Sequence, residues 1–334
     1  MTHATKPQLI ALDWGTSNLR ANLLGPDGQS LEQRSAPGGI MAVQNGQFAA
    51  VLSTLCGDWL TQFNGPVLAS GMIGSRQGWQ EAPYLDCPAS LGQAAAALTQ
   101  VAFAPVEFPS DLPLSQPRTL HIAPGLRYQD ASGAYDVMRG EETQIWGAQL
   151  PPGSCCVLPG THSKWAWTGQ AGSIVQFATY MTGELYAVLT HHSILGRLMD
   201  LGPTAAGAPR QLDTDTFLQG ARQGLHHHAQ ATHALFAVRT AGLMGQVQAA
   251  ALPDFLSGLL IGIEIGGALA SWTSAQSRQD VVLIGDAALC QRYSLALELA
   301  GLRASRAVAD ATTAGQWQIA QAAGLVPGAG GSKN

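Results

Sequence analysis

Charged residues are scarce in this chain of 334 residues: only 12% are Asp, Glu, Lys or Arg, and the formal net charge is -5. The 17 Lys and Arg residues form no basic run, whereas a protein that holds a phosphate backbone needs a positively charged face. We therefore do not expect nucleic acid as a partner. Hydrophobic residues make up 46% of the chain, which is typical of a compact globular protein and not of a disordered one.

Cysteine is also scarce, and none of the five cysteines has the spacing of a metal site. An odd number of cysteines in mostly apolar surroundings indicates a reducing compartment more than a disulfide framework. The first residues contain no apolar segment long enough for a signal peptide before Asp13 interrupts them. We therefore expect a cytoplasmic protein.

One apolar segment, residues 255–270, imitates a membrane span. It is shorter than the roughly 20 residues that a transmembrane helix needs, and it carries Glu264 near its middle. Gly258, Gly262 and Gly266 follow one another at every fourth position and indicate close packing against another helix. We expect a buried helix and no membrane partner.

The length of the chain predicts two domains. Strand-like and helix-like segments alternate, as in a mixed α/β protein, and helices are expected near residues 183–199, 214–229 and 254–271. Prolines recur at every fourth position between residues 104 and 118, which excludes a helix and indicates an extended connector. We place the boundary there and expect an N-terminal domain at 1–112, a C-terminal domain at 113–327 and a loose tail at 328–334.

The segment IALDWGTSNLR places Asp13 at the end of an apolar strand and Gly15, Thr16 and Ser17 in the turn that follows. Such a turn can offer several backbone N–H groups and two hydroxyls to one anion, so it is a candidate phosphate cradle. Asp13 is a candidate ligand for Mg²⁺, which takes one or two carboxylates plus the substrate phosphates. The alternative is a hairpin whose polar residues satisfy their own backbone.

A second segment, CVLPGTHSKWAW, repeats the order of strand, Gly-Thr turn and strand. Gly160, Thr161 and His162 would form a second cradle, and two such turns facing one another would clamp the phosphates of a nucleotide. Lys164 could reach a phosphate as a point charge, and a solvated surface lysine is the alternative. His162 either donates to a phosphate or caps the turn.

Two acids, Glu141 and Glu142, follow Gly140 at the predicted start of a helix. The helix dipole favours acids there for structural reasons alone. An alcohol that attacks a γ-phosphoryl group also needs a carboxylate that orients it and accepts its proton. Glu141 is our first candidate for this base, and Glu142 is the second.

Near the C-terminal end, an apolar strand runs into Gly285, Asp286 and Ala287 and then into a helix. Ligands commonly bind at such turns, because they lie at the carboxyl ends of sheets. Small residues there leave room for an adenine ring, although any strand-to-helix turn can require a glycine.

The loop at 69–88 combines glycines with polar and aromatic side chains that suit a small polyhydroxy acid: Gly74, Ser75, Arg76, Trp79, Glu81 and Tyr84. Arg76 or Arg139 could pair with a substrate carboxylate in the bidentate geometry of a guanidinium. A surface loop without a ligand is the alternative. Thr182 is expected as the N-cap of a helix with Glu184 in its first turn, and a role in binding substrate hydroxyls is open to both.

Taken in order, segments from nearly the whole chain resemble the 2-dehydro-3-deoxygalactonokinase family: ALDWGTSNLR, GMIGSRQGW, VMRGEETQIWGA, LPGTHSKW, MTGEL, FLSGLLIG and VVLIGD. That family is part of the sugar kinase, heat-shock ATPase and actin superfamily. The resemblance implies an α/β fold with two ribonuclease H-like, actin-like ATPase domains flanking a nucleotide cleft. It implies Mg²⁺-dependent transfer of a phosphoryl group from ATP to the 6-hydroxyl of 2-dehydro-3-deoxy-D-galactonate, in galactonate catabolism.

Carried over residue by residue, the resemblance implies Asp13 with the turn at 15–17 as the first phosphate motif, the turn at 160–162 as the second, and residues 285–287 near the adenosine. Related carbohydrate kinases have a catalytic Asp at a position that looks like Glu141, in a segment one residue longer. His162 stands where the superfamily commonly has a small hydroxyl residue or Gly.

Three questions stay open at this point. The acceptor could be another keto-deoxy sugar acid or a sugar, because fold and phosphate motifs do not choose it. A non-catalytic, actin-like ATP-binding switch is the alternative from a different class. A two-fold homodimer is expected only because such dimers are the commonest soluble assembly.

Overall fold

The computed structural model describes residues 6–105, 117–202, 211–272, 280–306 and 310–328. Internal contacts divide the chain into two units. Unit 1 comprises Met1–Gly153, Trp167–Phe177 and Val308–Asn334, and unit 2 comprises Ser154–Ala166 and Ala178–Ala307. Most of the expected connector and nearly all of the expected tail lie outside the described residues, and the domain boundary at residues 112 and 113 stays a prediction.

Unit 1 is built on a six-stranded sheet with the order β3-β2-β1-β4-β7-β6. Its strands are β1 (Leu9–Trp14), β2 (Asn18–Leu24), β3 (Ser30–Pro37), β4 (Val67–Ser70), β6 (Thr99–Phe103) and β7 (Arg118–Ile122). β1 and β2 form the expected antiparallel hairpin, whereas β4 pairs with β1 in parallel. A smaller sheet has the order β5-β8-β9 and comprises β5 (Tyr84–Asp86), β8 (Gly125–Gln129) and β9 (Tyr135–Met138).

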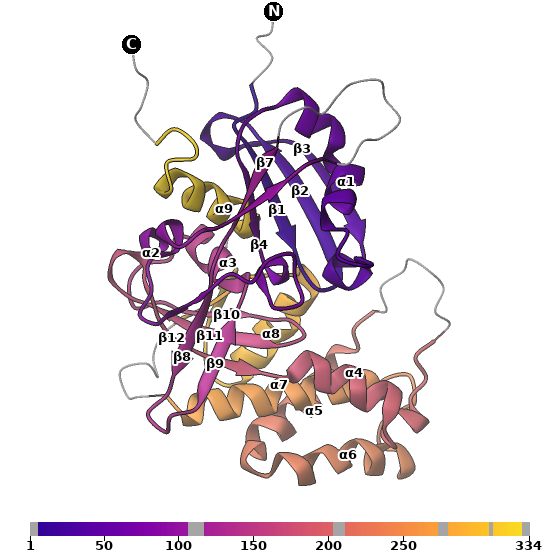
Figure 1. Cartoon of the computed structure of the whole chain (residues 1–334). Helices are drawn as coiled ribbons and strands as arrows, with labels where there is room; N and C mark the ends of the chain where they lie inside the picture. Colours follow the sequence, from indigo (N-terminus) through magenta and orange to yellow (C-terminus); the bar gives the residue numbers. More distant parts are fainter. Residues whose placement is uncertain (1–5, 106–116, 203–210, 273–279, 307–309, 329–334) are drawn as a thin grey trace, which may run out of the picture. The chain divides into compact units, whose positions relative to one another are not determined.

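The α-helices of unit 1 are α1 (Phe48–Gln62), α2 (Leu91–Ala96), α3 (Glu141–Gly147) and α9 (Ala311–Ala322). α9, drawn in yellow in Figure 1, lies against β1 and β4, where the buried Gln316 donates from Nε2 to the carbonyl of Leu12 at 2.7 Å. α9 also packs tightly on α3, because a Cβ on Gly147 would lie only 1.8 Å from the carbonyl oxygen of Ala311. The last described helix therefore fixes α3 beside the central strands of unit 1.

The second sheet has the order β12-β11-β10-β13-β14. Its strands are β10 (Cys155–Leu158), β11 (Ser163–Thr168), β12 (Ile174–Tyr180), β13 (Val281–Leu283) and β14 (Ala304–Arg306). β10 repeats the arrangement of β1, with the next two strands of the sequence on one side and a parallel strand, β13, on the other. This repeated order confirms the expected fold class, a mixed α/β protein with two sheet-based units.

The α-helices of unit 2 are α4 (Thr182–His192), α5 (Thr214–His226), α6 (Ala231–Leu243), α7 (Leu252–Ala270) and α8 (Ala287–Leu299). Short 3-10 helices lie at Pro26–Gly28, Gly39–Ala42, Met72–Gly74, Gln170–Gly172, Gly196–Leu198 and His228–Gln230. Among the described residues, α7 is the helix long and apolar enough to cross a membrane, but 78% of its most apolar window is buried inside the protein. The expected buried helix is confirmed.

Glycines bring α5 and α7 into backbone contact. A Cβ on Gly258 of α7 would lie 2.0 Å from the carbonyl oxygen of Phe217, and a Cβ on Gly220 of α5 would lie 2.1 Å from that of Phe255. Side chains larger than hydrogen would push the two helices apart. The close packing expected from the glycine spacing is therefore confirmed.

We expect Gly258→Ala to lower the free energy of unfolding by about 2 kcal/mol, because the new methyl group has no space at this crossing. Gly267→Ala in the same helix is the matched control, since its Cβ would make an ordinary contact at 3.9 Å with Cε1 of Tyr180. Its higher helix propensity should raise the free energy of unfolding by up to about 1 kcal/mol. Urea unfolding of both variants measures the difference, and equal midpoints would contradict the packing argument.

Candidate functional site

Asp13 lies at the carboxyl end of β1 with its side chain 26% exposed, and Nη1 of Arg20 lies 3.7 Å from its Oδ2. Burial raises the pKa of Asp13 above its ordinary value, the positive charge of Arg20 lowers it, and the negative charge of Glu141 raises it. Two carboxylates therefore influence one another at this edge of the sheet. A divalent cation would relieve their repulsion.

Two glycines allow the chain to approach closely at this edge. A Cβ on Gly71, which follows β4 with φ +93°, would lie 2.9 Å from the carbonyl oxygen of Trp14. Gly140, with φ +111°, precedes α3, and its Cβ would lie 3.1 Å from Cα of Gly71. Only glycine adopts both conformations without strain. The start of α3, with Glu141, is thereby held next to the ends of β1 and β4.

The turn after Asp13 leaves backbone amides unused. The carbonyls of Gly15 and Thr16 accept hydrogen bonds from the amides of Ile40 at 3.0 Å and Met41 at 3.3 Å. Among the described residues, the amides of Thr16 and Ser17 donate to no backbone or side-chain acceptor, and both residues are exposed. These two N–H groups are available to an anion, so the structure does not support a hairpin that satisfies itself.

The two candidate bases differ in burial. Glu142 is 0% exposed, and its carboxylate oxygens accept hydrogen bonds from the amide of Gly140 at 2.9 and 2.7 Å. Burial, followed by the charge of Glu141, raises the pKa of Glu142 to about 7. Glu141 is only partly buried, and its Oε2 accepts a hydrogen bond from the amide of Arg139 at 3.0 Å. Glu142 therefore caps the start of α3, whereas a ligand can reach Glu141.

The two candidate arginines also differ. Arg76 is exposed, with 87% of its side chain accessible, and forms an ion pair with Glu81 at 3.1 Å. Arg139 is 7% exposed, and its guanidinium lies 4.2 Å from the ring centre of Tyr84. Among the described residues, Nε and Nη1 of Arg139 and the buried Oγ of Ser75 have no hydrogen-bond partner. Because unpaired buried donors are costly, Arg139 and Ser75 are suited to bind an acceptor from a ligand.

Gly74 and Trp79 have different structural roles in the loop at 69–88. A Cβ on Gly74 would lie 2.9 Å from Nη1 of Arg139, so the glycine leaves room for the guanidinium. Trp79 stacks on Phe48, with ring centroids 5.8 Å apart, and meets Trp14 at 6.4 Å. The indole therefore packs against the hydrophobic core of unit 1, and its contact with substrate stays a prediction.

In unit 2, the turn Gly160–His162 joins β10 to β11, and Thr161 and His162 are exposed. Nε2 of His162 forms a hydrogen bond with the carboxylate of Glu184. Lys164 is 4% exposed, and its Nζ donates to the carbonyl of His162 at 3.2 Å. Lys164 is thus not a solvated surface lysine, because it supports the turn from inside the protein.

The first turn of α4 packs directly on this turn. A Cβ on Gly183 would lie 2.4 Å from the carbonyl oxygen of Gly160, and the amide of Glu184 donates to the carbonyl of Thr161 at 2.9 Å. The expected N-cap role of Thr182 is wrong, because the helix begins one residue earlier and Met181 occupies the cap position. Thr182 and Glu184 therefore lie beside the turn Gly160–His162.

The segment predicted near the adenosine is exposed and lies beside the same turn. Asp286 is the N-cap of α8 and accepts hydrogen bonds from the amides of Ala288 at 2.9 Å and Leu289 at 3.1 Å. A Cβ on Gly285 would lie 3.6 Å from the carbonyl oxygen of Pro159. The predicted nucleotide-binding residues of unit 2 thus gather at the carboxyl ends of β10 and β13, because these strands pair in parallel.

Two residues at these sites were not predicted. Arg20 stands opposite Asp13 in the register of the hairpin, so the predicted turn already contained the signal. Glu264 lies in the middle of α7 and accepts hydrogen bonds from Ser163 and Thr182, which flank the second turn. An acid inside an apolar helix was its only sequence signal.

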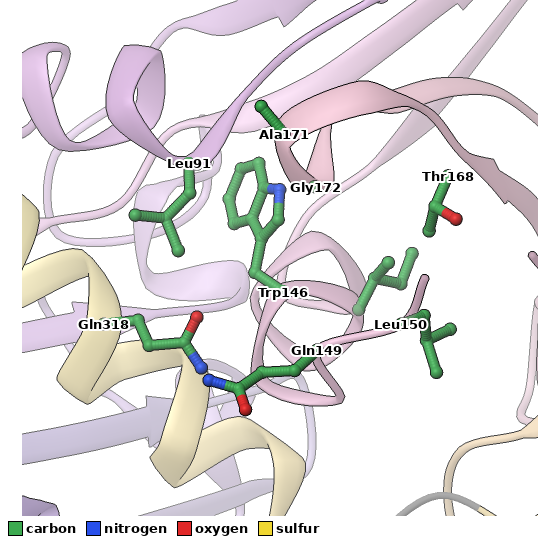
Figure 2. A pocket seen from close by; sticks show the side chains of 9 residues that line it. Leu91, Trp146, Gln149, Leu150, Thr168, Ala171, Gly172 and Gln318 are labelled. Carbon is green, nitrogen blue, oxygen red and sulfur yellow. The ribbon is translucent and has the colours of Figure 1, made fainter. Parts of the chain in front are cut away.

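Unit 1 also contains a cavity of about 390 Å³ at the C-terminal end of α3 (Figure 2). It is lined by Leu91, Ile145, Trp146, Gln149, Leu150, Thr168, Ala171, Gly172 and Gln318. In Figure 2 the amide ends of Gln149 and Gln318 point toward one another. None of the predicted site residues lines this cavity, and Glu141 lies at the other end of α3. The cavity is therefore separate from the predicted site.

A model of the 2-keto-3-deoxy-galactonokinase family matches residues 13–319. The chain belongs to this family. The 2-dehydro-3-deoxygalactonokinase of Escherichia coli (strain K12) is 35% identical over 316 residues, which are 94% of this chain and 97% of the relative. A Rhizobium meliloti (strain 1021) protein assigned the same activity is 37% identical over 305 residues, or 90% of this chain and 92% of the relative.

A crystal structure supports the same assignment. It shows a Sinorhizobium meliloti protein assigned as a 2-dehydro-3-deoxygalactonokinase. The two sequences are 34% identical, and the structures superpose with a TM-score of 0.78 over 94% of this chain and 96% of that chain. The family resemblance of the sequence motifs is therefore confirmed. Family membership likewise confirms the expected enzyme class, an ATP-using kinase with 2-dehydro-3-deoxygalactonokinase activity in galactonate catabolism.

The buried carboxyl of Glu142 should make the stability of this kinase depend on pH. Its pKa is about 7 in the native state and 4.5 ordinarily, so the native state binds a proton that the unfolded chain has released between these values. The free energy of unfolding should therefore fall by roughly 3 kcal/mol as the pH rises through this range. Asp13 and Glu264 change stability in the same direction.

Comparison with Glu142→Gln isolates the contribution of Glu142, because the amide does not titrate. Urea unfolding at several pH values between 4.5 and 8 gives the free energy of unfolding as a function of pH. This free energy should fall less steeply with pH for the variant than for the wild type. Parallel curves would show that Glu142 does not carry the effect.

Proposed function

We propose that this kinase transfers the γ-phosphoryl group of ATP to the 6-hydroxyl of 2-dehydro-3-deoxy-D-galactonate, with Glu141 as the catalytic base. The observation that carries the proposal is the proximity of Asp13 and Glu141 at the carboxyl edge of β1, next to a turn with two unused amides. The family model and the Escherichia coli relative support the choice of substrate.

In the proposed reaction, the 6-hydroxyl oxygen attacks the γ-phosphorus and the bond to the bridging β-phosphate oxygen breaks. ADP leaves with the electron pair, and the proton of the hydroxyl passes to the carboxylate of Glu141. The amides of Thr16 and Ser17 are proposed to bind one phosphate group, and the turn Gly160–His162 another. Catalysis then rests on orientation and charge neutralisation.

Mg²⁺ fits the edge at Asp13, because this partly exposed carboxylate lies near a second one whose charge raises its pKa. Among the described residues, no three His, Cys, Asp or Glu side chains gather as a ligand set. An ion held by one or two carboxylates and the substrate phosphates does not require one. Asp13 would hold the ion, which neutralises phosphate charge when bound.

We propose that Arg139 and Ser75 bind the carboxylate of the sugar acid. Arg139 has two unpaired nitrogens, Nε and Nη1, on a buried guanidinium, and Ser75 adds an unpaired hydroxyl from the loop at 69–88, where Nη2 of Arg139 donates to the carbonyl of Ala82. Free N–H donors on a charged guanidinium suit a carboxylate, because hydrogen bonds between two charged groups are strong. Arg76 is already paired with Glu81 at the surface.

Three further properties stay predictions. The acceptor preference is testable with a panel of aldonic and keto-deoxy acids, and a neutral hexose with a higher kcat/KM would refute the proposed substrate. All five cysteines are free thiols, which supports a cytoplasmic location. Sedimentation analysis would test the expected homodimer.

The base assignment predicts that Glu141→Ala lowers kcat by at least about 100-fold while the Kd for ADP stays nearly unchanged, since the lost carboxylate acts on the acceptor hydroxyl. Asp215→Ala is the matched control, because Asp215 is also an acid in the first turn of a helix but is exposed. Steady-state kinetics and calorimetry measure both quantities. Wild-type turnover in Glu141→Ala, and equally in Glu142→Ala, would refute the assignment.

For the carboxylate site, Arg139→Lys should raise the KM for the sugar acid by about tenfold and leave the KM for ATP unchanged, because lysine keeps the charge but loses the planar array of N–H donors. Arg76→Lys is the control and should change the KM of either substrate less than about twofold, because an exposed ion pair contributes little. If Arg76→Lys produced the larger effect, the two arginines would have been assigned the wrong way round.

A further inference from the structure

We propose that Glu264 is a positioning residue for nucleotide binding, which holds the turn Gly160–His162 in place from inside unit 2. In the described part of the chain, the hydrogen-bond partners of Glu264 do not include the predicted phosphate-binding residues Thr161 and His162. It acts through the residues that flank the turn. The inference rests on the proposed function, because it assumes that this turn binds a phosphate group of the nucleotide.

The carboxylate of Glu264 is 2% exposed and accepts hydrogen bonds from four side chains. Oε1 accepts from Nε1 of Trp165 at 2.7 Å, and Oε2 accepts from Oγ of Ser163 at 3.0 Å and from the hydroxyl of Tyr293 at 2.6 Å. Oγ1 of Thr182 also donates to Oε2. One carboxylate thus joins three separate segments of unit 2 to α7.

Two of the three segments carry predicted nucleotide contacts, and the third, at the start of α4, packs against the turn. Ser163 begins β11 directly after the turn, and Thr182 begins α4, whose next residue packs against Gly160. Tyr293 lies in α8, the helix that begins after the N-cap Asp286. Fixing these three donors to one acceptor therefore fixes the turn relative to the segment predicted near the adenosine.

A carboxylate is the group that this position requires. Both of its oxygens accept hydrogen bonds, whereas the amide of glutamine has one accepting oxygen and one donating nitrogen. Glutamine would therefore place N–H groups against hydroxyls that already donate to Glu264. Burial raises the pKa of Glu264, and the hydrogen bonds from the four side chains lower it. Because the hydrogen bonds of a buried network strengthen one another, replacing Glu264 by glutamine should cost more than the one hydrogen bond that it removes.

A second buried acid in α7, Asp254, provides a control that distinguishes positioning of the turn from general support of the fold. Asp254 is 0% exposed, forms an ion pair with Arg292 at 3.1 Å and accepts a hydrogen bond from the amide of Asp213 at 3.0 Å. It lies ten residues before Glu264, or about 15 Å along the helix axis. Asp254→Asn therefore disturbs a buried network in the same helix without direct contact to the turn.

The test compares Glu264→Gln, Ser163→Ala and Asp254→Asn with the wild type. Calorimetry gives the Kd for ADP, steady-state kinetics give the KM for ATP and for the sugar acid, and hydrogen exchange follows the amides of residues 158–166. Thermal unfolding reports the loss of stability in each variant. Ser163→Ala removes one donor and keeps the carboxylate, so it serves if Glu264→Gln folds poorly.

We expect Glu264→Gln to raise the Kd for ADP and the KM for ATP by about tenfold or more, because a small displacement of binding groups has large effects. The KM for the sugar acid should change less than the KM for ATP, since its proposed carboxylate contacts, Arg139 and Ser75, lie in unit 1 and Thr182 is the one predicted substrate contact that bonds to Glu264 in the described structure. Exchange should accelerate at residues 158–166. Ser163→Ala should raise the Kd for ADP by a smaller factor. The double variant with both Glu264→Gln and Ser163→Ala should bind ADP no more weakly than Glu264→Gln alone.

Asp254→Asn should lose stability without a change in the Kd for ADP. The inference is overturned if Glu264→Gln and Ser163→Ala bind ADP like the wild type, or if Asp254→Asn weakens ADP binding as much as they do. A wild-type protein that binds no adenine nucleotide would instead refute the proposed function, and this inference with it.

Discussion

The parallel pairing of two strands in each sheet is the constraint on which the candidate site depends. Pairing of β1 with β4 brings Asp13 and Ser70 to one edge of the first sheet, and pairing of β10 with β13 does the same for the ends of those strands in the second. The carboxyl ends of parallel neighbours lie at the same end of the sheet, so the turns that follow the two strands are close together. Glycines then let these turns approach, as Gly71 and Gly140 do beside Asp13. Hairpin, parallel neighbour and glycine together explain why the polar residues of each unit gather at one place.

Burial divides the carboxylates of this kinase into different roles. Glu142 and Glu264 are almost fully buried and accept several hydrogen bonds each, as expected of groups that hold structure together. Asp13 and Glu141 remain partly exposed at the edge of the sheet. A carboxylate can bind a cation or accept a proton from substrate only if the ligand reaches it. Accessibility therefore favours Glu141 over Glu142 as the base, although the two residues are neighbours in the chain.

The sequence predicted those parts of the site that depend on local pattern. The hairpin at Asp13, the turn at Gly160 and the packing of α7 all follow from spacing within about 20 residues. Contacts between distant segments were not predictable in this way: Ser163 and Glu264 are 101 positions apart, and Gln316 reaches back 304 positions to Leu12. Spacing also does not report burial, which is what separates Arg139 from Arg76. The N-cap error at Thr182 has the same cause, because its hydroxyl donates to Glu264 and not to its own helix.

The two turns proposed to bind phosphate groups are similar in sequence but are supported differently. The first has its carbonyls bound by residues 38–41, has unused amides at Thr16 and Ser17, and lies beside two partly exposed carboxylates. The strand before the second turn ends without an acid, the partly exposed Glu184 is hydrogen-bonded to His162, and Lys164 and Glu264 support the turn from the protein interior. A turn beside accessible carboxylates fits the proposed part in the chemistry, whereas a turn held by buried side chains fits the proposed part in holding the nucleotide. The internal repeat thus supplies one backbone arrangement twice, and the side chains beneath each copy assign it a different task.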